Sequence, residues 1–107
     1  MKLVVAIVHA QDADACVTAL NAAGFICTRY ASFGGFLDHD NVTLLIGVDA
    51  LQVDEVIDIA RRHAKRRNEI AAAGGPASAT SPASSPIEVE VGGATVFVLD
   101  VDRFERL

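Results

Sequence analysis

The sequence predicts an α+β domain in which two helices cover one face of an antiparallel sheet. Three observations lead to this prediction. Apolar, β-branched runs of strand length occur at 2–9, 25–33, 42–48, 87–91 and 94–101. Apolar residues recur at three- and four-residue steps in 12–23 and again in 53–64, as on one face of a helix. Gly92-Gly93 separates the last two apolar runs, which is typical of a tight hairpin turn.

The first half of the chain reads as strand, helix, strand, strand. Lys2 to His9 is a continuous apolar run and predicts a strand covered on both faces. The periodic segment from Asp12 to Ala23 predicts a helix, and Gly24 follows where a left-handed cap belongs. Phe25–Phe33 and Val42–Val48 then predict two strands of a hairpin, joined by a turn that contains two glycines.

The second helix is predicted to begin at an N-cap pair, Asp49 and Gln52. Its end carries a basic cluster, made up of Arg61, Arg62, Lys65, Arg66 and Arg67. Cations at this position suit the negative pole of the helix dipole, so a solvated helix end explains the cluster. The alternative is a rim that attracts anions.

The segment from Asn68 to Pro86 is rich in Ala, Gly, Ser, Thr and Pro, and we expect a long mobile loop there. Ile87–Val91 and Ala94–Val101 should then form a closing hairpin. The whole order is the split βαβ pattern of a ferredoxin-like fold (βαββαβ) with an extra C-terminal hairpin strand. One domain is expected over 1–107.

Strand 2–9 is apolar on both sides, with Leu3, Val5 and Ile7 alternating with a second apolar set. Two helices can cover only one face of the sheet. An apolar face left uncovered marks an interaction surface, so the sequence predicts burial against other copies of the chain.

Several motifs resemble those of the PII-like signalling proteins, and most closely their cyclic di-AMP receptor branch. They are the opening KLVVAIV, the pattern T-x-x-A-S-x-GGFL at 28–37, NVT at 41–43, and EVEVGGATVFVLDV at 88–101. The resemblance covers nearly the whole chain. It implies a non-enzymatic homotrimer that binds one cyclic di-AMP at each subunit interface and signals to an unknown downstream protein.

The resemblance also implies roles for six residues: Thr28, Gly35, Phe36, Leu37, Asn41 and Gly47. Thr28 would bond an adenine edge, Phe36 and Leu37 would pack on the base, and Asn41 would supply an amide. Gly35 and Gly47 would let the ligand approach closely. From the residues alone, an adenine needs an apolar face and fixed donors, which Phe36, Thr28 and Asn41 could provide.

Composition argues against several other functions. A net charge of −5 disfavours nucleic acid as a partner. The apolar opening is too short to span a membrane, so a cytoplasmic protein is expected. No cofactor is expected. His9, His39 and His63 share no catalytic or metal-ligand spacing, and no metal site is predicted. Cys16 and Cys27 are expected to act as small buried hydrophobic residues. The alternatives are a trimer that senses another nucleotide or a metal ion, and a structural trimer without a small-molecule ligand.

Overall fold

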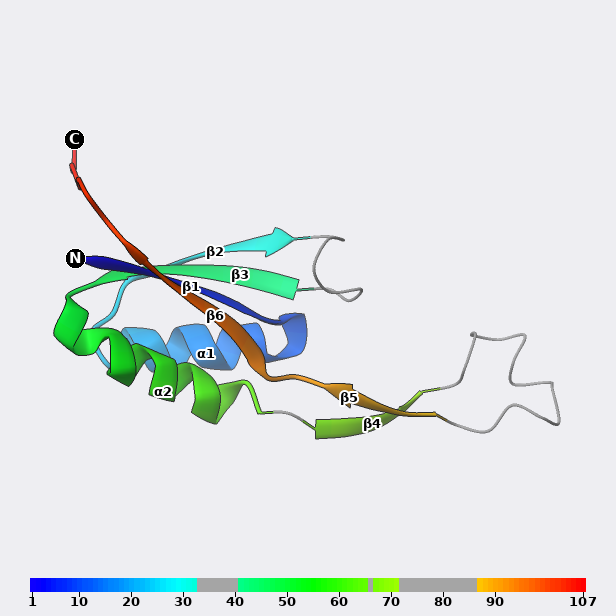
Figure 1. Cartoon of the computed structure of the whole chain (residues 1–107). Coiled ribbons are helices and arrows are strands. Elements are labelled where there is room, and N and C mark those ends of the chain that lie inside the picture. The colour runs from blue at the N-terminus through cyan, green and yellow to red at the C-terminus, as the bar shows by residue number, and fades with distance from the viewer. Residues whose placement is uncertain (33–40, 66, 72–86) are drawn as a thin grey trace, which may run out of the picture.

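The computed structural model describes residues 1–32, 41–65, 67–71 and 87–107, with only the backbone considered at 31–32, 67–71 and 87–91. In chain order its elements are β1 (Lys2–His9), α1 (Ala10–Ala22), β2 (Cys27–Ser32), β3 (Asn41–Val48), the 3₁₀ turn η1 (Ala50–Gln52), α2 (Val53–His63), β4 (Arg67–Ala71), β5 (Ile87–Val91) and β6 (Ala94–Asp100) (Figure 1). No helix in this described part is long and apolar enough to cross a membrane.

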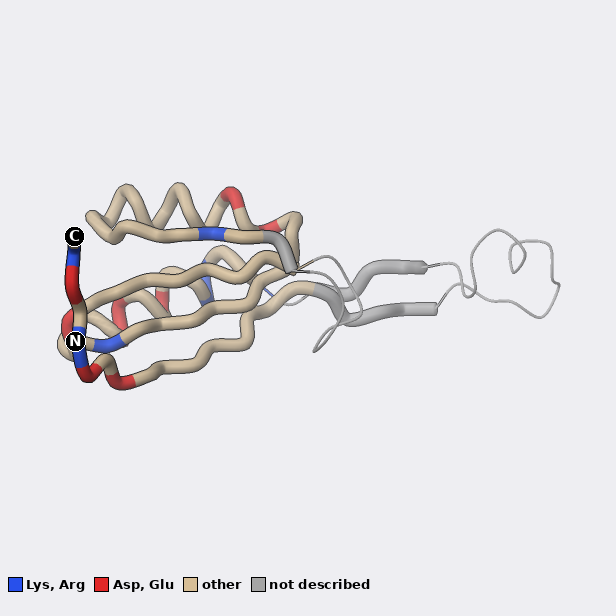
Figure 2. Tube along the Cα trace, turned by 90° about the horizontal axis from the view of Figure 1, so that it is seen from above, with Lys and Arg blue, Asp and Glu red and all other residues tan. Residues whose placement is uncertain are grey.

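Four strands form one antiparallel sheet in the order β2-β3-β1-β6, and α1 and α2 lie on the same face of it (Figure 1). This is the ferredoxin-like arrangement that the sequence predicts. The strands carry few charges along most of their length, and both termini lie at one end of the sheet (Figure 2).

The core lies between the helices and the sheet. Alternate residues of β1 and β3 point toward the helices and are at most 6% exposed: Val4, Ala6, Val8, Val42, Leu44, Ile46 and Val48. Cys16 and Leu20 of α1, with Val56 and Ile59 of α2, close the core from the other side. Because a strand alternates its side chains, β1 places Leu3, Val5 and Ile7 on the opposite face.

The end of α1 and the start of α2 follow the predicted signals. Gly24 has φ +92°, the left-handed conformation that glycine adopts without steric cost, and it follows Ala23, the C-cap residue of α1. Ahead of α2, the side-chain oxygen of Gln52 accepts from the backbone N–H of Asp49 at 3.2 Å, which completes a capping box across η1.

Two predictions for the C-terminal half are wrong. β5 and β6 do not form a hairpin with each other, because β6 pairs with β1 whereas β5 pairs with β4 in a separate two-stranded sheet. The register gives the reason: Ala94 already lies opposite Val8, so residues before position 94 extend beyond β1 and need another partner. β4 supplies it, and residues 68–71 are therefore strand rather than part of a loop.

Candidate functional site

The sheet face opposite the helices, which we call the open face, carries a broad apolar surface. Its apolar members are Leu3, Val5, Ile7, Leu45, Phe97 and Leu99. The strand register aligns Leu45, Val5 and Phe97 in one row, because Val5 lies opposite both of the others. Phe97 is 47% exposed and Leu99 is 48% exposed. An apolar face of this extent is unusual for a surface that contacts only water.

Thr28 and Gly47 lie next to each other on this face. Thr28 pairs with Leu45 and therefore shares its side of the sheet, and Gly47 follows two residues further along β3. Diagonal neighbours of this kind are about 7–8 Å apart. Both residues are exposed, so an external molecule can reach the Thr28 hydroxyl across the bare backbone of Gly47.

Asn41 is on the same face but at the other end of β3. It lies four residues from Leu45, which corresponds to about 14 Å along a strand. It is buried, with 6% of its surface exposed. The structure thus brings Thr28 and Gly47 together, whereas Asn41 can contact only a different part of any shared ligand.

The packing of the described residues does not require glycine at position 47. Its φ is not positive, and among the described residues a Cβ built there would meet only the flexible Met1 side chain, at an ordinary 3.7 Å. Glycine inside a strand lowers stability and commonly marks close approach by a ligand or another backbone. Its place beside Thr28 therefore favours an external contact.

Tyr30 is a further candidate site residue that the sequence reasoning missed. It is two residues from Thr28 in β2, which puts it on the same face, and it is 52% exposed. The i, i+2 spacing within a predicted strand was the available signal. Arg29, in contrast, points to the helix face, where its guanidinium donates to Asp14 of α1 at 2.5 Å.

A hollow lies on the helix side, between the end of α2 and the start of β6. This α2/β6 groove has a volume of about 650 Å³. Its lining residues are Ile57, Ala60, Arg61, Ala64, Lys65, Gly93, Ala94 and Val96. The structure thus divides the basic cluster, because Arg61 and Lys65 line the groove whereas Arg62 does not.

Comparison with known proteins shows which family the chain belongs to. A family model described as the cyclic-di-AMP receptor matches residues 1–107. The chain belongs to the cyclic di-AMP receptor family. The crystal structure of a functionally unknown protein from Pediococcus pentosaceus ATCC 25745 is also similar, with 38% identity and a TM-score of 0.75. That match covers 99% of this chain and 96% of the other.

Membership of the cyclic di-AMP receptor family confirms the resemblance drawn from the sequence motifs. Of the six residues that the resemblance implied, Thr28, Asn41 and Gly47 are on the open face. The predicted contacts of Gly35, Phe36 and Leu37 lie outside the described residues.

The described histidines and cysteines each have an identifiable place in the fold. His9 caps α1 by accepting from the backbone N–H of Gln11 at 3.1 Å, and His63 is at the far end of α2. Burial raises the pKa of the Cys16 thiol to about 11 and also raises that of Cys27, which makes both poor nucleophiles. Within the described ranges, no three His, Cys, Asp or Glu side chains could together hold a metal ion.

Proposed function

We propose that this protein is a non-enzymatic, cytoplasmic signalling receptor that binds cyclic di-AMP between the subunits of a homotrimer. The observation that carries the proposal is the match to the cyclic di-AMP receptor family over residues 1–107, which we take as a single domain. One ligand is expected per chain.

The open face supports self-association. The row formed by Leu45, Val5 and Phe97 is uncharged. Phe97 and Leu99, two large side chains of the open face, are about half exposed. Burying such a face against equivalent faces removes apolar surface from water without any additional protein. A closed symmetric trimer does this for all three copies.

The chemistry near Thr28 suits an adenine. A threonine hydroxyl can both donate to and accept from the base edge, and the exposed ring of Tyr30 offers an aromatic surface about 7 Å along the strand. The bare backbone at Gly47 gives the ligand room. Phe36 and Leu37 would pack on the base and Gly35 would approach the ligand. Because Asn41 is at the other end of β3, it would bind a different part of the molecule.

Signalling would pass through two segments that would flank the ligand, the predicted turn at 34–41 and the part of 68–86 that follows β4. Ligand contacts that favour one arrangement of these segments over others would shift their populations and change the surface offered to a downstream protein. Amide hydrogen exchange tests this step. Slower exchange in both segments at saturating cyclic di-AMP is expected, and unchanged exchange in both would contradict the mechanism.

The first experiment is titration calorimetry with cyclic di-AMP, with ATP and cyclic di-GMP as controls. Saturable binding of one cyclic di-AMP per chain, without comparable heat from the controls, is expected. Heat from ATP alone would favour a receptor for another nucleotide. No heat from any of the three would refute the ligand assignment.

A matched pair of variants tests the site. Thr28→Val keeps the side-chain shape but removes the hydroxyl, and loss of one hydrogen bond should weaken binding about tenfold. Thr18→Val makes the same change at an exposed position of α1 and should leave affinity unchanged. Equal affinities for both variants would remove Thr28 from the site.

A further inference from the structure

Met1 extends the open face beyond the start of β1. Its carbonyl oxygen accepts from the backbone N–H of Val101 at 3.2 Å, so the hydrogen bonding between β1 and β6 continues through this residue. Leu3 lies opposite Gly47 on the open face, and side chains two residues apart in an extended chain share a face. Met1 therefore belongs to the same face as Leu3 and Gly47.

The thioether end of Met1 lies over the bare backbone of Gly47. A Cβ built on Gly47 would be 3.7 Å from Met1 Cε, and among the described residues only Met1 would come so near to it. Met1 is 49% exposed, so about half of its surface is open to another molecule. Because Thr28 and Gly47 are diagonal neighbours, a molecule that reaches the Thr28 hydroxyl across Gly47 meets the Met1 side chain.

We propose that Met1 is a further ligand-contact residue, whose thioether packs against the face of an adenine that Thr28 holds by its edge. The inference rests on the proposed receptor function and adds a residue to its binding site. Met1 and Thr28 approach the same base from two directions, with the bare backbone of Gly47 between them.

A thioether suits the face of a base, whereas a hydroxyl suits its edge. Methionine has three rotatable bonds and a polarisable sulfur, so its side chain adjusts to a flat ring and gains favourable contacts between sulfur and the aromatic system. The hydrogen-bonding groups of a base lie along its edges, where the Thr28 hydroxyl can donate or accept. Met1 and Thr28 thus complement each other at one base.

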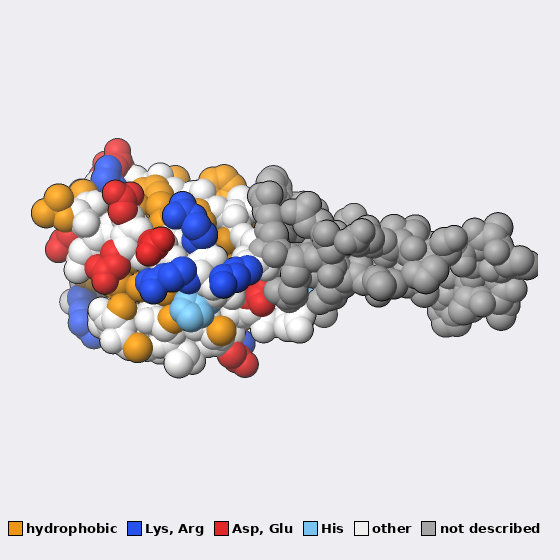
Figure 3. All heavy atoms as spheres, turned by 90° about the horizontal axis from the view of Figure 1, so that it is seen from below, with side chains coloured by type: hydrophobic (Ala, Val, Ile, Leu, Met, Phe, Trp, Pro, Cys, Tyr) orange, Lys and Arg blue, Asp and Glu red, His pale blue; other side chains and the backbone are white. Residues whose placement is uncertain are grey.

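A charged pair near this end of the sheet lies on the other face. Lys2 pairs with Asp100, and each follows an open-face residue by one position, which places the pair on the helix side. Figure 3 shows further Lys, Arg, Asp and Glu side chains on that side. Met1 itself is uncharged and cannot neutralise a phosphate, so its contact is with the base of the ligand.

The chain contains one methionine, which makes its methyl group a specific probe for nuclear magnetic resonance. The full-length protein is labelled with carbon-13 at that methyl group, and mass spectrometry verifies that Met1 is retained. Cyclic di-AMP should shift the Met1 signal with the dissociation constant that calorimetry gives. It should also produce a nuclear Overhauser effect between the methyl group and an adenine proton, which a residue with a purely structural role would not show.

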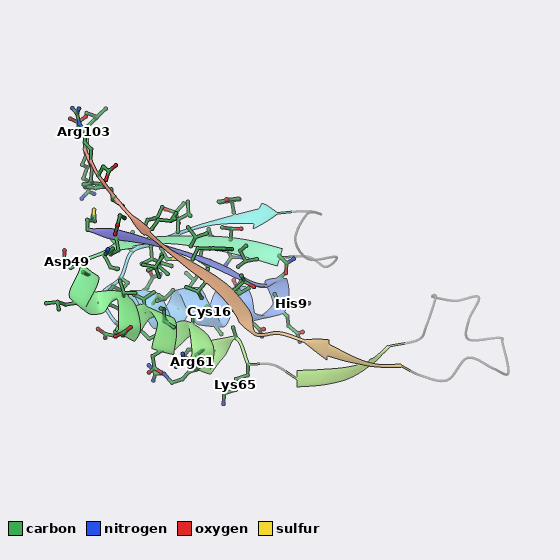
Figure 4. All side chains as sticks on the ribbon, in the orientation of Figure 1. His9, Cys16, Asp49, Arg61, Lys65 and Arg103 are labelled. Atoms are coloured by element: carbon green, nitrogen blue, oxygen red, sulfur yellow. The ribbon has the colours of Figure 1, made fainter. Side chains whose placement is uncertain are left out.

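Oxidation supplies a matched pair of proteins. Mild peroxide converts Met1 to its polar sulfoxide and should weaken cyclic di-AMP binding about tenfold. Norleucine incorporated in place of Met1 has a similar shape without sulfur and forms no sulfoxide, so its affinity should stay within about threefold of the unmodified protein, before and after peroxide. The norleucine protein also reports any effect of cysteine oxidation, although Figure 4 shows Cys16 between α1 and the sheet, away from the open face.

Three results would overturn the inference and leave the receptor function standing. The first is calorimetric binding of cyclic di-AMP without a shift or a nuclear Overhauser effect at the Met1 methyl group. The second is unchanged affinity of the sulfoxide, or an equal loss in the norleucine protein after peroxide. The third is dissociation of the trimer by the sulfoxide in sedimentation, which would assign Met1 to the subunit interface.

Calorimetry of the unmodified protein separates this inference from the proposed function. Binding of cyclic di-AMP there, together with any of the three results above, removes only Met1 from the site. Absence of binding refutes the receptor assignment itself, and the Met1 contact fails with it. Circular dichroism shows whether the oxidised and norleucine proteins are folded before their affinities are compared.

Discussion

Replacing Phe97 with glutamate should dissociate the proposed trimer. Phe97 is in the row of the open face that also contains Val5 and Leu45, and it remains 47% exposed in the single chain. A phenylalanine buries about 200 Å² when it is fully covered, so an interface would remove a further 95 Å² or so from water. At about 25 cal/mol per Å², this burial contributes about 2 kcal/mol for each copy.

A loss of about 2 kcal/mol lowers an association constant roughly 30-fold, and a carboxylate enclosed by apolar neighbours lowers it further. Sedimentation equilibrium at micromolar concentration measures the effect. The wild type should sediment as a trimer and Phe97→Glu as a monomer. Because Phe97 is on the open face and half exposed, the variant should keep its fold, which far-ultraviolet circular dichroism checks.

Leu51→Glu is the matched control, since Leu51 is 96% exposed on η1 and is not on the open face. It introduces the same charge at an apolar surface residue and should leave the trimer intact. A monomeric wild type at 100 μM, or a trimer that survives Phe97→Glu, would refute the assignment of the open face. Equal dissociation of both variants would attribute the effect to charge alone.

Three further predictions follow from burial, pKa and the candidate site. Leu44→Ala removes a fully buried side chain and should lower the free energy of unfolding, measured in urea, by about 2–5 kcal/mol. Leu51→Ala, at an exposed position, should change it by less than about 0.5 kcal/mol. A loss below about 1 kcal/mol for Leu44→Ala would contradict the described core. Because folding raises the pKa of the Cys16 thiol from 9.0 to about 11, its contribution to stability is complete below pH 9 and is lost as pH rises toward 11. Cys16→Ala should therefore remove about 2 kcal/mol of the decline in unfolding free energy between pH 8.5 and 11, and an unaltered decline would exclude this residue as its source. Phe36→Ala and Asn41→Ala should each weaken cyclic di-AMP binding in calorimetry while sedimentation still shows a trimer; loss of the trimer would assign either side chain to the interface.

The sequence could predict the candidate site only where the alternation of side chains along a strand determines which face of the sheet a residue lies on. Side-chain alternation along 25–33 puts Thr28 and Arg29 on opposite faces of the strand, and in the structure Arg29 accordingly contacts Asp14 of α1 on the helix side. It did not show that Thr28 and Gly47 are diagonal neighbours, because that depends on the pairing register of β2 with β3. Register is a property of two strands together.

The sequence by itself determined the helices, the end of α1, the start of α2 and the alternation of β1 and β3, since these depend on residues within one helical turn or a few strand positions. Gly24 and the pair Asp49 and Gln52 are examples. Only the tertiary structure decided the partners of β5 and β6. Locally, two apolar runs around Gly92-Gly93 favour a hairpin, but β1 offers β6 a longer pairing partner inside the sheet and ends at His9. Backbone groups beyond that end need a partner from another part of the chain, and this requirement is not encoded in any short segment.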